Sequence, residues 1–189
     1  MLAGLLDAVG EPSARQPLGD PYGSLVRAIV GQQLSVGAAR SIYERLLVFF
    51  DGARPSPQQL LDTDPEEMRV AAGLSRAKVT FVRSLAEHVL SGELELDRLG
   101  ELSDDEMIAE LTAVKGIGTW TAHMFMMFEL GRDDILATGD LGVRRAVERA
   151  YGLPELPGPA ELELIAEPWR PHRSAACLLL WHSLSNAPG

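Results

Sequence analysis

Residues 111–140 read LTAVKGIGTWTAHMFMMFELGRDDILATGD, and this stretch decides the expected fold. Gly116 and Gly118 flank one apolar residue, so the backbone can turn sharply between a helix that ends and a helix that begins. The first amides of the second helix have no acceptor within it, and such a turn suits a phosphate group. Asp140 then stands alone at a junction between a loop and a further helix.

The first of these helices has a clear start and a clear apolar face. Ser103 and Glu106 have the S-x-x-E spacing of a capping box, which predicts that the helix begins there. The spacing of apolar residues predicts a buried stripe and a helix end near the last of them: Met107, Ile108, Leu111 and Val114.

Helical periodicity recurs along nearly the whole chain, and alternating strand patterns are almost absent, so the fold is expected to be all-α. Glycines at 52, 73, 92, 131 and 152 are expected to end helices. The predicted helices are 24–31, 35–50, 57–62, 65–72, 75–91, 103–114, 118–130, 141–151, 160–166 and 171–185. No internal repeat interrupts the pattern, and we expect one domain over residues 1–189.

Composition limits the class of protein. With 189 residues and 46% hydrophobic content, the chain can bury a core of its own. Its one cysteine, Cys177, excludes an internal disulfide and a four-cysteine zinc or iron–sulfur site. No signal peptide is visible, and no run approaches the ~18 apolar residues of a membrane helix. We therefore expect a cytoplasmic protein.

Net charge is the main argument against a nucleic-acid partner. The formal charge is −10, whereas phosphate binding depends on local positive charge and counterion release. A total charge does not map a surface, however, because the acids and the bases are grouped in different segments. The grouped arginines near Asp140 and the last helix are Arg144, Arg145, Arg149, Arg170 and Arg173.

Residues 115–122 (KGIGTWTA) and 139–145 (GDLGVRR) resemble the corresponding segments of helix-hairpin-helix DNA glycosylases, in particular the alkylation-repair branch of the 3-methyladenine DNA glycosylase II type. The resemblance extends from about Tyr22 to the last helix. It implies two helical lobes around a cleft, with the hairpin inside residues 103–130 and a loop bearing aspartate after it. The extra N-terminal domain of larger members is expected to be lacking.

Asp140 is the expected catalytic residue. Cleavage of the bond between base and deoxyribose passes through an oxocarbenium-like transition state, which a nearby carboxylate stabilises while it orients or deprotonates water. An alkylated purine already carries positive charge and leaves as a neutral base, so a strong general acid is unnecessary. The competing interpretation is that Asp140 only caps the helix that follows, and the two roles are compatible.

The resemblance places aromatic walls for an extruded base at Trp120 and Trp181, and Met124 where relatives have another aromatic. Indoles would attract a cationic purine by cation–π interaction. The alternative is that both tryptophans belong to the core. Related lyases carry a Schiff-base lysine at the position of Trp120, and Lys115 lies five residues earlier, so no lyase activity is expected.

Contacts with the DNA backbone are implied for the hairpin and for two arginines. In the loop 31–35 (GQQLS), Gln33 falls at the position where relatives insert a side chain into the DNA, and Leu34 is the alternative wedge. An ordinary turn with Ser35 as helix cap is an equal interpretation of this loop. The expected backbone contacts are Lys115, Gly116, Ile117, Gly118, Thr119, Arg144 and Arg173.

No cofactor is expected to be required. Relatives hold a monovalent cation at the hairpin through main-chain carbonyls, which correspond to those of Thr112, Val114 and Ile117. None of the four histidines has the spacing of a transition-metal site.

The sequence thus predicts a monofunctional DNA glycosylase that flips alkylated purines such as 3-methyladenine out of double-stranded DNA, as a monomer, in base-excision repair. The alternatives are a non-catalytic DNA-damage binding or architectural protein, a glycosylase for oxidised or deaminated bases, and a purely structural helical protein. Asp140 argues against the first, and the missing lysine and iron–sulfur cysteines argue against the second. A structural role leaves the assembled motif unexplained.

Overall fold

The computed structural model describes residues 2–10 and 19–185, and this part of the chain is built of helices and contains no strand. Contacts divide the chain into two compact units. One unit comprises residues 18–122, and the other comprises residues 1–17 and 123–189. The boundary falls inside one helix, α8 (Thr119–Phe128), directly after the hairpin. The all-α prediction is confirmed.

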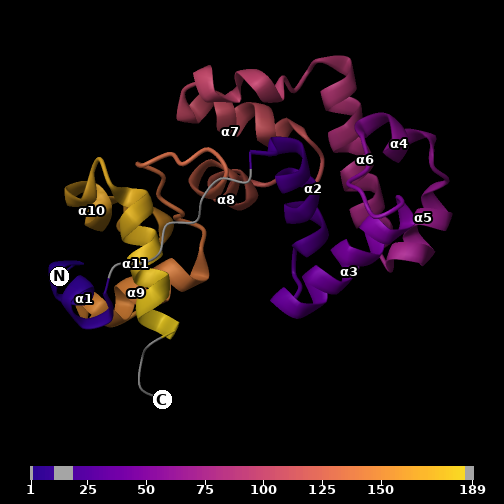
Figure 1. The fold of residues 1–189 in the computed structure, drawn as a ribbon. Coiled ribbons are helices and arrows are strands. Elements are labelled where there is room, and N and C mark those ends of the chain that lie inside the picture. The colour runs from indigo at the N-terminus through magenta and orange to yellow at the C-terminus, as the bar shows by residue number, and fades with distance from the viewer. Residues whose placement is uncertain (1, 11–18, 186–189) are drawn as a thin grey trace. The chain divides into compact units, whose positions relative to one another are not determined.

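In residues 19–122, the described part of the first unit, seven helices are complete and α8 begins. Helix α4 packs on α6, α5 packs on α3, and α2 packs on both α3 and α6 (Figure 1). Fully buried side chains from several of these helices, including Leu25, Ile29, Leu46 and Leu85, form the core. The helices are α2 (Pro21–Gly31), α3 (Val36–Phe49), α4 (Pro57–Asp62), α5 (Pro65–Ala72), α6 (Arg76–Ser91), the 3₁₀ helix η1 (Leu96–Glu101) and α7 (Asp104–Ala113).

Local signals set the ends of α7 as the sequence predicts. The Ser103 hydroxyl accepts the Glu106 amide, and the Glu106 carboxylate accepts the Ser103 amide at 2.9 Å, which completes the capping box. Of the predicted stripe, Met107, Leu111 and Val114 are fully buried. The apolar face therefore fixes the helix that leads into the hairpin.

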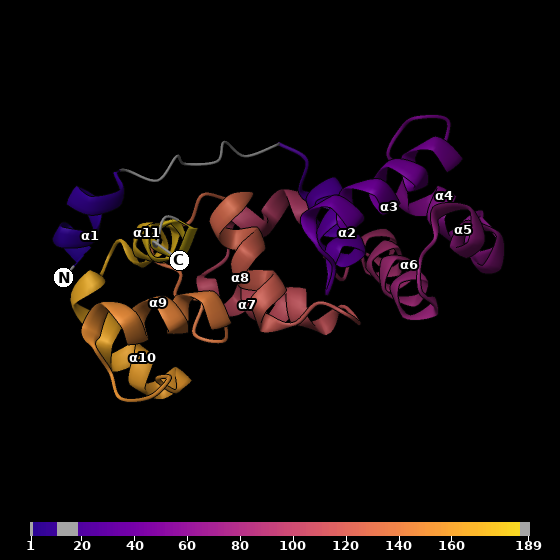
Figure 2. The same ribbon diagram turned by 90° about the horizontal axis from the view of Figure 1, so that it is seen from below.

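The other unit is built around the last helix, α11 (Arg173–Ser185). Helices α1 (Leu2–Val9) and α9 (Leu141–Tyr151) both pack on α11 (Figure 2). Helix α10 (Pro159–Ala166) leads directly into the 3₁₀ helix η2 (Glu167–Trp169). In the described part of the chain no helix is long and apolar enough to cross a membrane.

Several predicted boundaries were wrong. Helix α2 begins at Pro21 instead of residue 24, because the Asp20 side chain accepts the Gly23 amide and caps an earlier turn. Helix α11 begins at Arg173, two residues after the predicted start at Pro171. Helices α1, η1 and η2 were not predicted.

Candidate functional site

The loop between α8 and α9 is fastened to the start of α11. Ser174 on α11 is buried, and its hydroxyl donates to the Arg132 carbonyl at 2.6 Å and accepts the Ile135 amide at 3.0 Å. The Asp134 carboxylate accepts two bonds from the Arg173 guanidinium, at 2.7 and 2.9 Å, and one from Arg170 at 2.7 Å. These bonds tie the loop that ends at Asp140 to a helix about forty residues further along the chain.

The surroundings of Asp134 stabilise the ionised form of its carboxyl group. Burial would raise the pKa of the Asp134 carboxyl, but the hydrogen bonds from Arg173 and the positive charges of Arg173 and Arg170 outweigh burial. The net effect is to hold the pKa of Asp134 below its usual value. This anchor was not anticipated from the sequence, since residues at 134 and 173 share no local motif.

Asp140 caps α9 and also meets the indole of Trp181. Its Oδ1 atom accepts the Val143 amide at 2.8 Å and the Trp181 Nε1–H at 2.7 Å. Both bonds hold this oxygen at the start of α9. The capping interpretation of Asp140 is confirmed, and it leaves the catalytic interpretation open.

Trp181 lies half-buried beside this carboxylate. Its ring stacks on Phe128, with ring centroids 6.0 Å apart and planes 26° apart. A side-chain carbon added at Gly142 would lie about 3 Å from the indole and from the Asp140 carboxylate, so glycine permits the indole to approach the start of α9. The indole is therefore fixed on one face and along one edge.

Trp120 is not a core residue, because 47% of its surface is exposed. The core interpretation of Trp120 is thus wrong, and its role in stacking on a base stays a prediction. Met124, one turn along α8, is half-buried. Trp120 and Trp181 belong to different units, and their pairing as walls of one pocket stays a prediction.

The two hairpin glycines differ in what the fold requires of them. Gly116 has φ +94°, and a side-chain carbon there would run into the ring of Phe81. Gly118 is exposed, has no left-handed backbone, and has open space where a side chain would begin. The fold therefore demands glycine only at Gly116.

Other hairpin residues have distinct surroundings. Ile117 is 4% exposed and its amide donates to the Val114 carbonyl at 3.0 Å, so its side chain and N–H both serve the turn itself. Lys115 is exposed, and its backbone amide donates to the Ser84 hydroxyl. Thr119 is exposed in the first turn of α8. Lys115, Gly118 and Thr119 are thus the accessible part of the hairpin.

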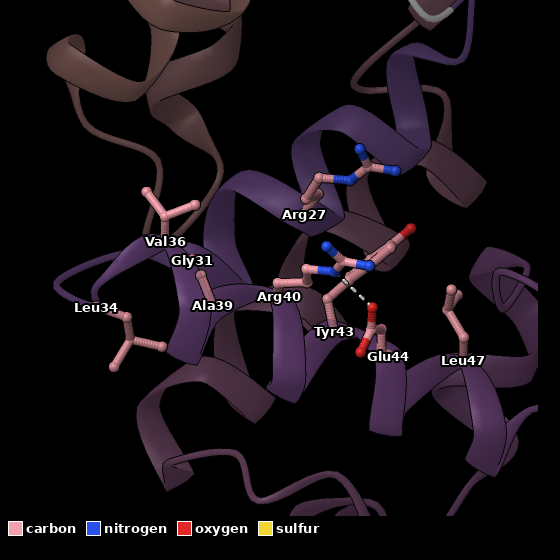
Figure 3. A pocket seen from close by; sticks show the side chains of 9 residues that line it. All are labelled: Arg27, Gly31, Leu34, Val36, Ala39, Arg40, Tyr43, Glu44 and Leu47. Atoms are coloured by element: carbon pink, nitrogen blue, oxygen red, sulfur yellow. Dashed lines mark hydrogen bonds and ion pairs between the residues drawn. The ribbon is translucent and has the colours of Figure 1, made fainter.

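The loop between α2 and α3 presents both candidate wedge residues at the surface. Gln33 has φ +56°, a left-handed conformation that is strained for a residue with a side chain. Leu34 lines a groove of about 580 Å³ between the two helices (Figure 3). Ser35 caps α3 as expected, so the cap and an exposed tip coexist in this loop.

The groove contains cations that were not singled out from the sequence. The Arg27 guanidinium lies 4.9 Å from the centroid of the Tyr43 ring, and Arg40 pairs with Glu44 at 2.7 Å (Figure 3). The arginines that were singled out are engaged elsewhere. Arg144 donates to the Pro157 carbonyl at 2.7 Å, and Arg173 is bound to Asp134. DNA contacts from Arg144 and Arg173 stay predictions, and such contacts require these bonds to be kept alongside or given up.

Side-chain metal ligands do not gather in any described segment. No group of three histidine, cysteine or carboxylate side chains that suits a metal ion occurs in residues 2–10 and 19–185. The three hairpin carbonyls, of Thr112, Val114 and Ile117, are of the oxygen type that hard cations prefer. The Val114 carbonyl also accepts the Ile117 amide, and it retains a second lone pair.

Comparison with known proteins identifies the family. Residues 26–171 match the sequence profile of the HhH-GPD superfamily of base excision DNA repair proteins. The chain belongs to this superfamily. The matched range includes the hairpin and Asp140 and ends before α11 and Trp181.

Individual relatives agree with the HhH-GPD assignment. DNA-3-methyladenine glycosylase 1 of Schizosaccharomyces pombe is 37% identical over 164 residues, which cover 86% of this chain and 72% of the relative. The crystal structure of a DNA-3-methyladenine glycosidase from Bacillus halodurans has a TM-score of 0.88 at 40% identity and covers 98% of this chain and 84% of its own. The S. pombe 3-methyladenine DNA glycosylase Mag1 in complex with abasic DNA has a TM-score of 0.86 at 34% identity, with 98% and 91% covered.

Proposed function

We propose that this HhH-GPD protein is a monofunctional DNA glycosylase that releases alkylated purines, such as 3-methyladenine, from double-stranded DNA as a monomer. The observation that carries the proposal is the Asp140 carboxylate, held by the Val143 amide and the Trp181 indole at the start of α9. Relatives named as 3-methyladenine glycosylases support the choice of substrate class.

Asp140 supplies the negative charge that the reaction needs. As the bond from the purine nitrogen to C1′ breaks, its electron pair leaves with the base, and positive charge develops on the sugar. The carboxylate stabilises that charge and accepts a proton from the water whose oxygen attaches to C1′. The two donors on Oδ1 fix the orientation of the group before substrate arrives.

The positive charge of the alkylated base itself favours cleavage of its bond to the sugar. A purine methylated on a ring nitrogen is cationic before cleavage and neutral after it, so no protein group has to protonate it. Trp120 and Trp181 are the proposed stacking partners, with a cation–π attraction on the order of 1–2 kcal/mol once water is excluded. Met124 adds a pliable apolar contact in place of a further aromatic ring.

Hydrolysis without strand cleavage follows from the residue types present. A lyase of this superfamily needs an amine nucleophile where Trp120 stands, and an indole cannot form a Schiff base. Lys115 lies on the hairpin, five residues before Trp120 in the chain. Water is therefore the proposed nucleophile, and an abasic site is the proposed product.

Backbone contacts are assigned to exposed groups of the hairpin. The amides of Gly118 and Thr119 at the start of α8 and the Lys115 ammonium are the proposed phosphate ligands. A monovalent cation on the carbonyls of Thr112, Val114 and Ile117 would add positive charge beside the same phosphate. Gln33 is the proposed wedge, with Leu34 as the alternative.

The test is base release from defined duplexes that contain 3-methyladenine, 7-methylguanine, ethenoadenine or hypoxanthine. We expect free base and an abasic site from the cationic lesions, no strand cleavage, and slower release of the neutral lesions. Tight binding of every damaged duplex without release of any base would instead identify a non-catalytic damage-binding protein. Preference for hypoxanthine over both methylated purines would reject the alkylation assignment.

A further inference from the structure

Gln32 lies where the loop between α2 and α3 meets the hairpin. It is half-buried at the C-cap of α2, directly before the strained residue Gln33. Its side-chain nitrogen donates to the Gly116 carbonyl at 2.8 Å, across 84 residues of sequence. The same nitrogen lies 3.4 Å from the hydroxyl of Thr121 in α8. One amide group thus contacts the hairpin turn and the helix that follows it.

The chemistry of these partners fixes the orientation of the amide. A backbone carbonyl such as that of Gly116 can only accept, so the atom facing it must be the NH₂ group. An amide nitrogen has two hydrogens, which is the number that Gly116 and Thr121 require. Thr121 is buried, so its contact is shielded from water.

A second bond holds the same end of α2. The Lys78 ammonium donates to the Val30 carbonyl at 2.6 Å, and burial lowers the pKa of Lys78. Residues 30 and 32 are therefore both fastened from outside the loop, immediately before Gln33. A left-handed conformation at a residue with a side chain persists only where the surroundings hold it. The two bonds give Gln33 such surroundings.

We propose that Gln32 is a positioning residue that couples the loop between α2 and α3, which carries the proposed wedge, to the hairpin. Phosphate binding at the hairpin then sets the position along the duplex at which Gln33 enters it. The inference rests on the proposed function, because it assigns a wedge and a phosphate site. It goes beyond that function in naming the bond from Gln32 to Gly116 as the link between them. Gln32 itself need not touch DNA.

The coupling predicts a separation between binding and base extrusion. Gln32→Met keeps the length of the side chain and removes both donors. The probe is a duplex with 2-aminopurine beside a tetrahydrofuran abasic analogue, whose fluorescence rises when the stack is opened. At saturating protein we expect at least half of the fluorescence rise to be lost and single-turnover release of 3-methyladenine to slow by about 10-fold, the scale of one lost hydrogen bond. Affinity for undamaged duplex should change by less than about 3-fold, because the phosphate ligands remain.

A second variant tests whether the donor itself matters. Gln32→Glu is isosteric, and its carboxylate opposes the Gly116 carbonyl, whereas the protonated acid can donate one hydrogen bond to it. The rate of this variant relative to the unaltered protein should therefore recover as pH falls from about 8 to about 5, through the range in which such a carboxyl takes up a proton. A role in filling space would give parallel pH profiles. This profile decides the matter if Gln32→Met fails to fold.

Gln58→Met is the matched control, since the Gln58 side chain on α4 donates to Asp62 at an exposed surface of the same unit. Unchanged fluorescence and release in Gln32→Met would overturn the inference. Loss of release in proportion to lost stability and to lost affinity for undamaged duplex would also overturn it. If the unaltered protein releases no base from any duplex, the proposed function fails, while the fluorescence measurement still tests Gln32 by itself.

Discussion

The indole Nε1–H of Trp181 donates to Oδ1 of Asp140 at 2.7 Å, and 41 residues of sequence separate the two. Trp181 therefore contacts the proposed catalytic group through the N–H on the edge of its ring. This contact is independent of any stacking of a base on the face of the ring. A hydrogen bond to a carboxylate contributes about 1.5–3 kcal/mol. The same Oδ1 atom also accepts the Val143 amide, so removal of the indole bond takes away one of these two donors to Oδ1.

Trp181→Phe distinguishes the contribution of the indole N–H from the contribution of ring stacking. Phenylalanine retains a flat ring beside Phe128 and lacks the N–H. If the indole bond orients Asp140, single-turnover release should fall by about 10-fold or more for cationic and neutral lesions alike. Trp181→Ala removes the face as well, and it should lower release of 3-methyladenine further than release of hypoxanthine. The measured quantity is the ratio of the two rates in each variant.

Trp169→Phe is the control for this experiment. Trp169 is buried in the same unit, and its indole N–H donates to the Tyr151 hydroxyl at 3.3 Å. It should lose some stability and retain the release rate per folded molecule. A normal rate in Trp181→Phe would show that the Asp140 bond is unimportant. An unchanged lesion ratio with a large loss of stability in Trp181→Ala would assign the ring to the core.

Alanine substitutions at the two hairpin glycines should affect different properties, DNA affinity at Gly118 and stability at Gly116. Gly118→Ala should fold normally, since it meets open space, and should weaken binding to damaged and undamaged duplex by a similar factor. Gly116→Ala should lower the free energy of unfolding by on the order of 2–4 kcal/mol, because of its φ of +94° and the Phe81 ring. Urea denaturation and duplex titration measure the two effects. Unaltered affinity in folded Gly118→Ala would make the hairpin only a structural turn.

The anchor at Asp134 should make stability depend on acid pH. The pKa of Asp134 is lower in the folded than in the unfolded chain, so its contribution is complete above the unfolded value of about 3.9 and is lost as pH falls through the folded value. Asp134→Asn should lower the free energy of unfolding at pH 7 by about 1–3 kcal/mol. It should also flatten the decline of stability below about pH 4.

Glu95→Gln provides the comparison, because Glu95 and Arg98 form a solvent-exposed pair that should contribute little to stability. Urea denaturation at pH 7 and at about pH 3 measures both variants. Equal losses in the two variants, or a full acid dependence in Asp134→Asn, would remove Asp134 as the anchor of the loop.

Features set by local physics were predictable from the sequence. The capping box at Ser103, the glycine ends of α5, α6 and α9, and the cap at Asp140 each depend on residues within one turn. The helix class follows from apolar spacing alone. Each of these features was confirmed.

Features set by distant partners were not predictable. The start of α11 was placed at Pro171, whereas the Arg173 amide donates to the Asp134 carboxylate from another loop, at 3.4 Å. The bonds from Gln32 to Gly116 and from Trp181 to Asp140 likewise join segments with no local relation. The sequence suggested Trp181 as a stacking wall, and its N–H contact with the proposed catalytic group is visible only in the folded chain.

In the proposed function, the Asp140 carboxylate drives release of an alkylated base. The most direct measurement is single-turnover release of 3-methyladenine from a defined duplex by the unaltered protein and by Asp140→Asn, with Asp64→Asn, a cap of α5, as the matched control. Asparagine also caps helices, so Asp140→Asn should fold and bind damaged duplex, and it should release base at least about 10²-fold more slowly. Release within a few fold of the unaltered rate, by a folded and DNA-bound Asp140→Asn, would show that the carboxylate does not drive base release.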